Sequence, residues 1–152
     1  MIIPRLLLLL CVASLGVFSP NLMALGVDDA MEFSASGIMV QKMRLTITAE
    51  NIANISTFKT DSGLPYRRKF AVIVPDKKGV RLSEIRESSQ PFGKAYDPPN
   101  PLSDKSGFVH VPNVSLGEEM VTLAYTQLLH EANVTAFKSA KAMYQQSLEL
   151  LK

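Results

Sequence analysis

The sequence predicts a mainly α fold, in which long N- and C-terminal helices form a coiled-coil-like pair and a small proline-rich β or extended segment is inserted between them. Two stretches carry apolar residues at helical spacing, one starting at Val27 and one at Ser115. Seven of the nine prolines lie in the 57–112 segment, which disfavours helix there. The expected organisation is a leader, a first helix, a middle segment and a second helix, at 1–24, 25–56, 57–112 and 113–152.

Composition limits the class of protein. The 152 residues suffice for one ordinary domain, and 16 Lys+Arg against 14 Asp+Glu leave a net charge of +2, which argues against a nucleic-acid partner. With 47% hydrophobic and 20% charged residues, wholesale disorder is excluded. A single cysteine, Cys11, excludes a disulfide framework and a paired-thiolate zinc site. We therefore expect no metal, no cofactor and no small-molecule substrate.

Residues 1–24 are predicted to lie outside the fold. Arg5 precedes an apolar run from Leu6 to Phe18, which at about 13 residues is shorter than the roughly 20 that a membrane span needs. This pattern resembles a secretory signal peptide with Ala24 before the cleavage site. The alternative is that Met23 is the true start and that residues 1–22 are a wrongly assigned extension.

The first helix is expected from Val27 to about Ile52. Asp28 and Asp29 suit its start, while Asn51 and Asn54 suit its end because Asn tolerates a left-handed turn. Gly37 costs about 1 kcal/mol relative to Ala inside a helix, which indicates a close backbone approach. The apolar positions form two columns, Met31, Ile38, Leu45 and Ile52 in one and Phe33, Val40 and Ile47 in the other.

The middle segment is expected to contain three short strands that form one small sheet. Phe70–Val74, residues 80–83 and Phe108–Val111 are rich in β-branched or alternating apolar residues, and residues 76–79 are typical of a hairpin turn. A sheet this small needs a partner surface. The basic cluster 67–69 is interpreted as a solvated strand edge in preference to a phosphate-binding site.

The second helix is expected to begin with a capping box, in which Ser115 and Glu118 satisfy each other's backbone N–H groups. It runs to near Leu151, and the first helix can cover only one of its two apolar stripes. The uncovered side chains would contribute on the order of 10 kcal/mol to self-association, unless the middle segment folds back over them. One stripe holds Val121, Tyr125, Leu128, Leu129, Ala132, Ala136, Met143 and Leu150, and the other Met120, Leu123, Val134, Phe137, Tyr144, Leu148 and Leu151.

The sequence shows no arrangement typical of an active site. His110 and His130 lie apart, in a candidate strand and mid-helix, and are interpreted as structural or surface residues. Glu118 and Glu119 are adjacent on a helix and point about 100° apart, so they cannot act as a catalytic dyad. We therefore expect no catalytic residues and no enzyme activity.

Several motifs resemble a known family. These are Asn51-Ile52-Ala53-Asn54, Pro65-Tyr66-Arg67-Arg68, Tyr96-Asp97-Pro98, Gly107-Phe108-Val109, Glu119-Met120 and Glu131-Ala132-Asn133-Val134. In their order and spacing they resemble the FlgC family of flagellar basal-body rod proteins, within the flagellar axial rod and hook proteins. The chain departs from the family pattern at Leu128 and His130, where Arg and Tyr are usual, in a short loop at 77–79, and in its apolar leader.

The resemblance implies a structural, oligomeric subunit of the proximal rod in the bacterial flagellum basal body. Such a subunit leaves by type III export and joins a periplasm-spanning rod that transmits torque for motility. The implied partners are copies of itself, other flagellar rod proteins, and membrane-ring and adaptor proteins at the rod base. The alternative is a secreted periplasmic binding module that holds a lipid or peptide on an apolar helix face.

Two sets of residues are predicted to serve assembly. The subunit-packing positions are Val40, Ile47, Leu123, Val134, Phe137 and Tyr144. The helix-end and turn positions are Asn51, Asn54, Ser115, Glu118 and Asn133, with Asn133 bonding across helices.

Overall fold

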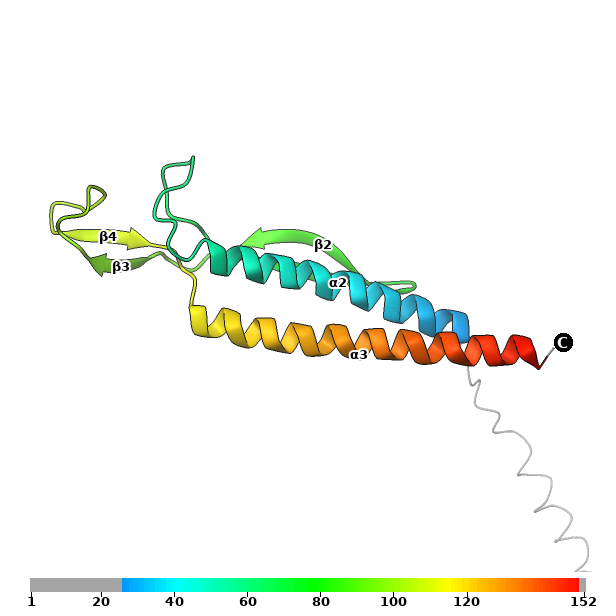
Figure 1. Cartoon of the computed structure of the whole chain (residues 1–152). Coiled ribbons are helices and arrows are strands. Elements are labelled where there is room, and N and C mark those ends of the chain that lie inside the picture. Colours follow the sequence, from blue (N-terminus) through cyan, green and yellow to red (C-terminus); the bar gives the residue numbers. More distant parts are fainter. Residues whose placement is uncertain (1–25, 151–152) are drawn as a thin grey trace, which may run out of the picture.

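A computed structural model describes residues 26–150 and contains two long helices and four strands (Figure 1). The predicted leader and Leu151 lie outside the described residues. In chain order the elements are α2 (Val27–Ala53), β1 (Lys69–Asp76), β2 (Gly79–Glu87), β3 (Gly93–Tyr96), β4 (Phe108–Val111) and α3 (Leu116–Glu149).

The prediction of a mainly α fold is wrong, because two separate antiparallel sheets of two strands each occupy the middle of the chain. In the first hairpin, the eight residues of β1 pair with β2 across a bulge between Val72 and Ile73. Pro75 has no N–H group to donate. It is tolerated because β1 pairs with a strand on one side only, so no hydrogen bond to a second neighbouring strand is lost. In the second hairpin, β4 pairs with β3, a strand that the sequence analysis did not predict. The protein is therefore a mixed α/β protein.

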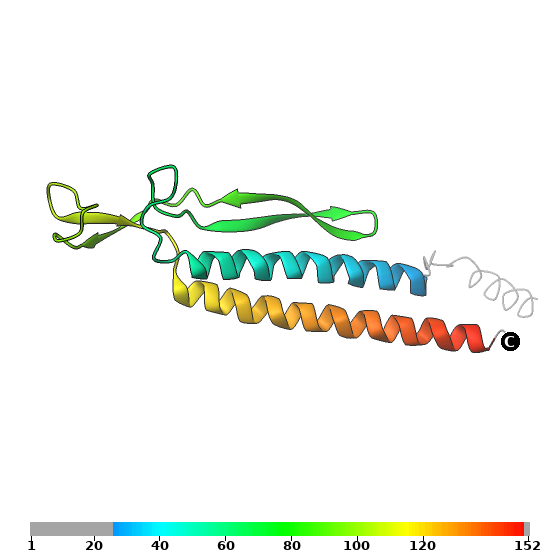
Figure 2. The ribbon, with the colours of Figure 1, turned by 45° about the horizontal axis from the view of Figure 1, so that its top comes forward.

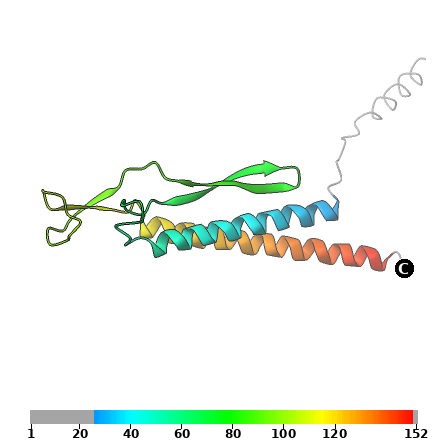
Figure 3. The same cartoon turned by 90° about the horizontal axis from the view of Figure 1, so that it is seen from above.

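Helix α2 packs against both α3 and the β1–β2 hairpin (Figure 2), and the hairpin runs alongside the helix pair (Figure 3). The hairpin tip is held to α2 by an ion pair between Lys78 and Glu32 (2.6 Å) and by the Val80 N–H, which donates to Ser36 Oγ (3.2 Å). The β1–β2 hairpin packs on α2 and not on α3. The middle segment therefore does not cover the outer face of α3.

The β3–β4 hairpin extends past the end of the helix pair (Figure 1). It packs against none of the other helices and strands in the described part of the chain. Val109 on β4 is buried and lines a small cleft together with Phe92 and residues of the 58–65 loop. The other face of the hairpin exposes Tyr96 and Phe108, whose rings meet edge to face at 5.3 Å.

The helix ends differ in part from the prediction. Asn51 lies within α2, and Asn54 caps that helix with φ −101°, so no left-handed residue ends it. Ser115 occupies the cap position of α3, but its side chain makes no capping hydrogen bond, so the capping box with Glu118 is not formed. Both side chains are exposed at this helix start, where water can satisfy the free N–H groups.

The interior is small and partly polar. The fully buried polar residues Asn51, Glu119 and Thr126 lie where α2 and α3 face each other. The buried apolar residues are Val40, Ile47, Tyr66, Val109 and Ala140. Between residues 26 and 150, neither helix combines the length and apolar character needed to cross a membrane.

Candidate functional site: a buried polar junction and the outer face of α3

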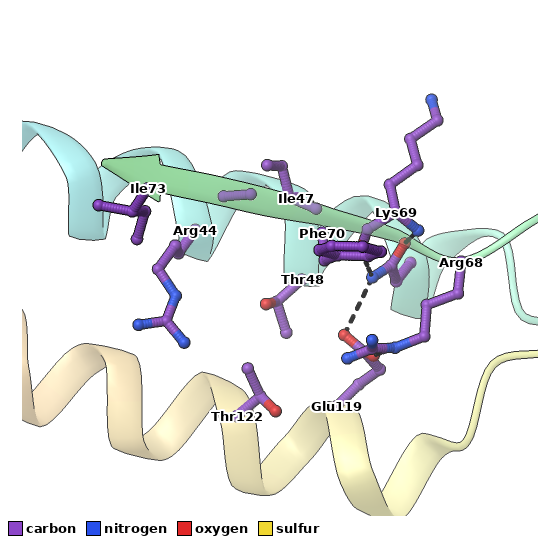
Figure 4. A pocket seen from close by; sticks show the side chains of 11 residues that line it. Arg44, Ile47, Thr48, Arg68, Lys69, Phe70, Ile73, Glu119 and Thr122 are labelled. Atoms are coloured by element: carbon purple, nitrogen blue, oxygen red, sulfur yellow. Dashed lines mark hydrogen bonds and ion pairs between the residues drawn. The ribbon is translucent and has the colours of Figure 1, made fainter. Parts of the chain in front are cut away.

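A buried polar junction joins three segments that are far apart in sequence: the end of α2, the start of β1 and the first turn of α3. The residues involved are Asn51, Tyr66, Arg68, Lys69 and Glu119. Figure 4 shows Arg68 reaching from the edge of β1 toward Glu119 on α3. The junction therefore sets how the hairpin and both helices sit relative to one another.

The Asn51 side chain is the centre of the junction and is 0% exposed. Its Nδ2 group donates to the Lys69 carbonyl (2.8 Å) and to Glu119 Oε2 (3.1 Å). Its Oδ1 accepts from the Tyr66 hydroxyl (2.9 Å) and from the Lys69 N–H (2.9 Å). An amide has two donors and two acceptor positions, so the hydrogen-bonding capacity of Asn51 is fully used.

The carboxylate of Glu119 is buried with the rest of its side chain. Arg68 Nε donates to Glu119 Oε1 at 2.5 Å, and the pair is strengthened by the Asn51 bond to the other carboxylate oxygen. A buried carboxylate needs such partners, because an unpaired charge in a protein interior is strongly unfavourable. The interpretation of Arg68 as a solvated strand-edge residue is therefore wrong.

The neighbouring basic residues are also engaged. Arg67 donates to the carbonyls of Ser88 and Gln90 (both 2.9 Å) and lies 4.2 Å above the ring of Phe92. Lys69 pairs with Glu50 at 2.6 Å. The basic cluster thus ties the entry of β1 to the rest of the chain, and glutamates pair with the charges of Arg68 and Lys69.

Tyr66 has a shifted ionisation equilibrium. Burial is the largest cause, and the nearby carboxylates Glu50, Glu119 and Glu87 add to it, which together raise the pKa of Tyr66 to about 12. The hydroxyl therefore stays protonated and remains a donor to Asn51 at neutral pH.

A cleft of about 400 Å³ opens beside the junction, bounded by α2, β1 and α3 (Figure 4). Arg44, Thr48 and Thr122 lie around it, but neither histidine does. The carboxylate of Glu119 at its edge is already committed to Arg68 and Asn51. Residues 26–150 contain no group of three or more His, Cys, Asp or Glu residues placed to hold a metal ion. The junction is therefore suited to holding the fold together.

Gly37 confirms the predicted close approach between helices. It is buried, and a Cβ atom added there would lie 2.8 Å from the side-chain amide of Asn133 on α3. Asn133 therefore packs directly on the α2 backbone, although the structure shows no hydrogen bond from its side chain across the helices.

The predicted subunit-packing positions lie in different surroundings. Val40 and Ile47 are buried inside the chain. Leu123, Val134 and Phe137 are half-buried, and Tyr144 is exposed.

The outer face of α3 carries the exposed apolar side chains. Val121 is 71% exposed and Leu128 62%, whereas the residues that α3 buries are Glu119, Thr126 and Ala140. The helix therefore exposes large apolar side chains on one face, although a surface helix usually turns such residues inward. We call this surface the apolar strip, and its exposed members are Val121, Tyr125, Leu128, Ala132, Ala136, Met143 and Leu150.

Sequence reasoning missed the junction, although its residues carried a signal. Glu119 lies at helical spacing from Thr122, Thr126 and Asn133, on the side of α3 that faces α2. The junction residues Asn51, Tyr66, Arg68 and Glu119 all belong to the motifs that resemble the rod proteins.

These features define an elongated structural protein, with an internal polar junction and a long uncovered apolar helix face. The chain is 33% identical over 150 residues to the flagellar basal-body rod protein FlgC of Borreliella burgdorferi, covering 84% of this chain and 99% of that protein. It is 35% identical over 131 residues to FlgC of Aquifex aeolicus (82% and 96% covered) and 32% over 128 residues to FlgC of Salmonella typhimurium (80% and 96%). No protein-family model matches the chain.

The chain therefore belongs to the FlgC family of flagellar basal-body rod proteins. It is a structural subunit of the basal-body rod and serves motility. The relatives give no support to the alternative of a lipid- or peptide-binding module.

Proposed function

We propose that the chain is a subunit of the proximal rod that assembles through the outer face of α3 and passes torque along the rod. In this proposal, segments 25–56 and 113–152 form the axial core and 57–112 a separate middle unit. Its partners are copies of itself, other rod proteins, and membrane-ring and adaptor proteins at the rod base. The observation that carries the proposal is the apolar strip, whose five large apolar side chains are each more than half exposed.

The strip is large enough to drive association. Fully burying a large apolar side chain contributes roughly 1.5 to 3 kcal/mol, and the five large strip residues are each more than half exposed. Covering them would therefore contribute on the order of 5 kcal/mol. Contacts of this kind pack as densely as a protein interior, which would make the assembled rod resist shear.

The predicted contact positions divide between two roles in this proposal. Val40 and Ile47, which the chain itself buries, hold α2 in place within the subunit. Leu123, Val134, Phe137 and Tyr144 lie toward the α2-facing side of α3 and extend the contact beyond the strip.

The experiment places a charge in the strip of the full-length protein. Tyr125→Asp and Leu128→Asp should each leave helix content unchanged by circular dichroism but abolish concentration-dependent association in sedimentation velocity, and cells that carry them should not swim. Gln127→Asp is the matched control, because Gln127 is also exposed on α3 but lies off the strip. Normal swimming and association with Asp in the strip would refute the proposal.

A further inference from the structure

A second apolar surface lies where α2 faces the β1–β2 hairpin. It is a cleft of about 210 Å³ between α2 and β2, and we call it the methionine cleft. Met39 at its mouth is 73% exposed. The cleft is lined by Ser36, Met39, Val40, Met43, Val80, Arg81 and Leu82.

The walls of the methionine cleft are held in place within the chain. Lys78 and Ser36 fix the hairpin tip to α2, and the Asn51 bonds to Lys69 fix the hairpin base. Methionine side chains are flexible and polarizable, so they adapt to an irregular apolar partner. The cleft is therefore a formed receptor surface with an adaptable lining.

The rim of the methionine cleft is basic. Arg81 lines the cleft and is exposed, and Lys42 is exposed one helical turn after Met39 on α2. Neither takes part in an ion pair with another described residue. By contrast, Lys78 and Lys69, which also lie along the α2–hairpin boundary, are paired with glutamates. The rim charges are thus available to a partner that carries carboxylates.

The apolar strip is bordered by acidic residues, which complement the basic rim of the methionine cleft. From Leu116 to Phe137, α3 contains no lysine or arginine. Its exposed acidic residues there, Glu118 and Glu131, lie on either side of the Val121–Leu128 part of the strip by helical spacing. The first half of α3 therefore presents an apolar ridge with an acidic border.

The two surfaces do not meet within one chain, because the β1–β2 hairpin packs on α2 and not on α3 (Figure 2). We propose that the Val121–Leu128 part of the strip docks into the methionine cleft of a second copy, with Glu118 and Glu131 facing Lys42 and Arg81. This inference rests on the proposed function and names the surface that receives the strip.

Because the two surfaces differ, the contact is heterologous, and a pair of copies keeps one free strip and one free methionine cleft. Such a contact continues from copy to copy and does not close into a pair. Charge complementarity at the rim of the contact would favour this alignment of the strip in the methionine cleft over others.

A charge exchange tests the register in the full-length chain. Arg81→Glu should weaken association about tenfold, since it replaces an attraction with a repulsion, and Glu131→Lys should do the same. The two changes in one polypeptide should restore association to within about threefold of wild type. Lys94→Glu on β3 is the matched control and should have no effect.

Cysteine cross-linking gives a direct readout. In a Cys11→Ser background, a mixture of a Met39→Cys protein and a Leu128→Cys protein should form a disulfide-linked heterodimer on oxidation, while each protein alone should not cross-link.

The outcomes separate the two proposals. Met43→Asp places a charge in the methionine cleft and should block association. The docking inference fails if this variant and the charge exchange leave association unchanged and the cysteine pair forms no cross-link. The proposed function still stands in that case if Leu128→Asp blocks association. If Leu128→Asp has no effect either, both fail. Cross-links to another rod protein, with none between copies, also overturn the inference.

Discussion

Asn51→Asp should be among the most damaging isosteric substitutions in this protein. The aspartate has the same shape but offers no donors, so the Lys69 carbonyl and Glu119 Oε2 each lose the N–H that now lies at 2.8 and 3.1 Å. It also places a second carboxylate beside that of Glu119 in a site with no exposed surface.

The magnitude follows from the two lost donors. Each buried group left without its partner costs about 1 to 3 kcal/mol, so the loss is about 2 to 6 kcal/mol before any repulsion between carboxylates is added. Single domains are stable by only about 5 to 15 kcal/mol in total. The variant should therefore lose a large part of its stability and unfold at a markedly lower urea concentration than the wild type.

Urea unfolding followed by far-ultraviolet circular dichroism measures the effect on the full-length chain at low concentration. Asn54→Asp is the control, because the half-buried Asn54 side chain bonds only locally, to Glu50 and Thr57, and its loss should cost about 1 kcal/mol or less. Equal midpoints and slopes for the two variants would show that the four bonds of Asn51 do not stabilise the fold.

Two further changes test the helix contact and the buried tyrosine. Gly37→Ala should lower the free energy of unfolding by about 1 to 2 kcal/mol, because the new methyl group would lie 2.8 Å from the Asn133 amide. Adding Asn133→Ala should restore the stability. A double-mutant cycle that shows no coupling between the two positions would contradict the contact. Because the pKa of Tyr66 is raised to about 12 in the folded state, its stabilising contribution is complete below pH 10 and is lost as the pH rises toward 12. The unfolding free energy should therefore fall between about pH 10 and pH 12, and Tyr66→Phe, compared at each pH, should remove that part of the slope.

Local patterns predicted the helices well. Apolar spacing and the acidic residues at 28–29 placed the first helix from Val27 to about Ile52, and α2 spans Val27–Ala53. The turn at 76–79 was also predicted, and Gly79 has the positive φ of +121° that suits its place there. These features depend on neighbours a few residues away, so a single sequence contains the information.

The features that sequence reasoning missed depend on distant partners. Strand β3, Gly93–Tyr96, has no β-branched residue and becomes a strand only by pairing with β4. Arg68 looked like a surface charge because its partner, Glu119, lies in another segment. Periodicity showed that Val40 and Ile47 lie on an apolar helix face, but it could not show that they are buried within their own chain.

The link between Asn51 and Glu119 joins positions 68 residues apart. The start of α3 supplies this link, so a chain that lacks α3 keeps the contacts between its hairpin and α2 but leaves Asn51 and Arg68 without their shared carboxylate partner. A chain delivered from its N-terminus onward would complete the junction only when its final quarter arrives, and α3 would then bring Glu119 and the apolar strip in the same step. Completion of the subunit's fold and presentation of its assembly surface would thus occur together.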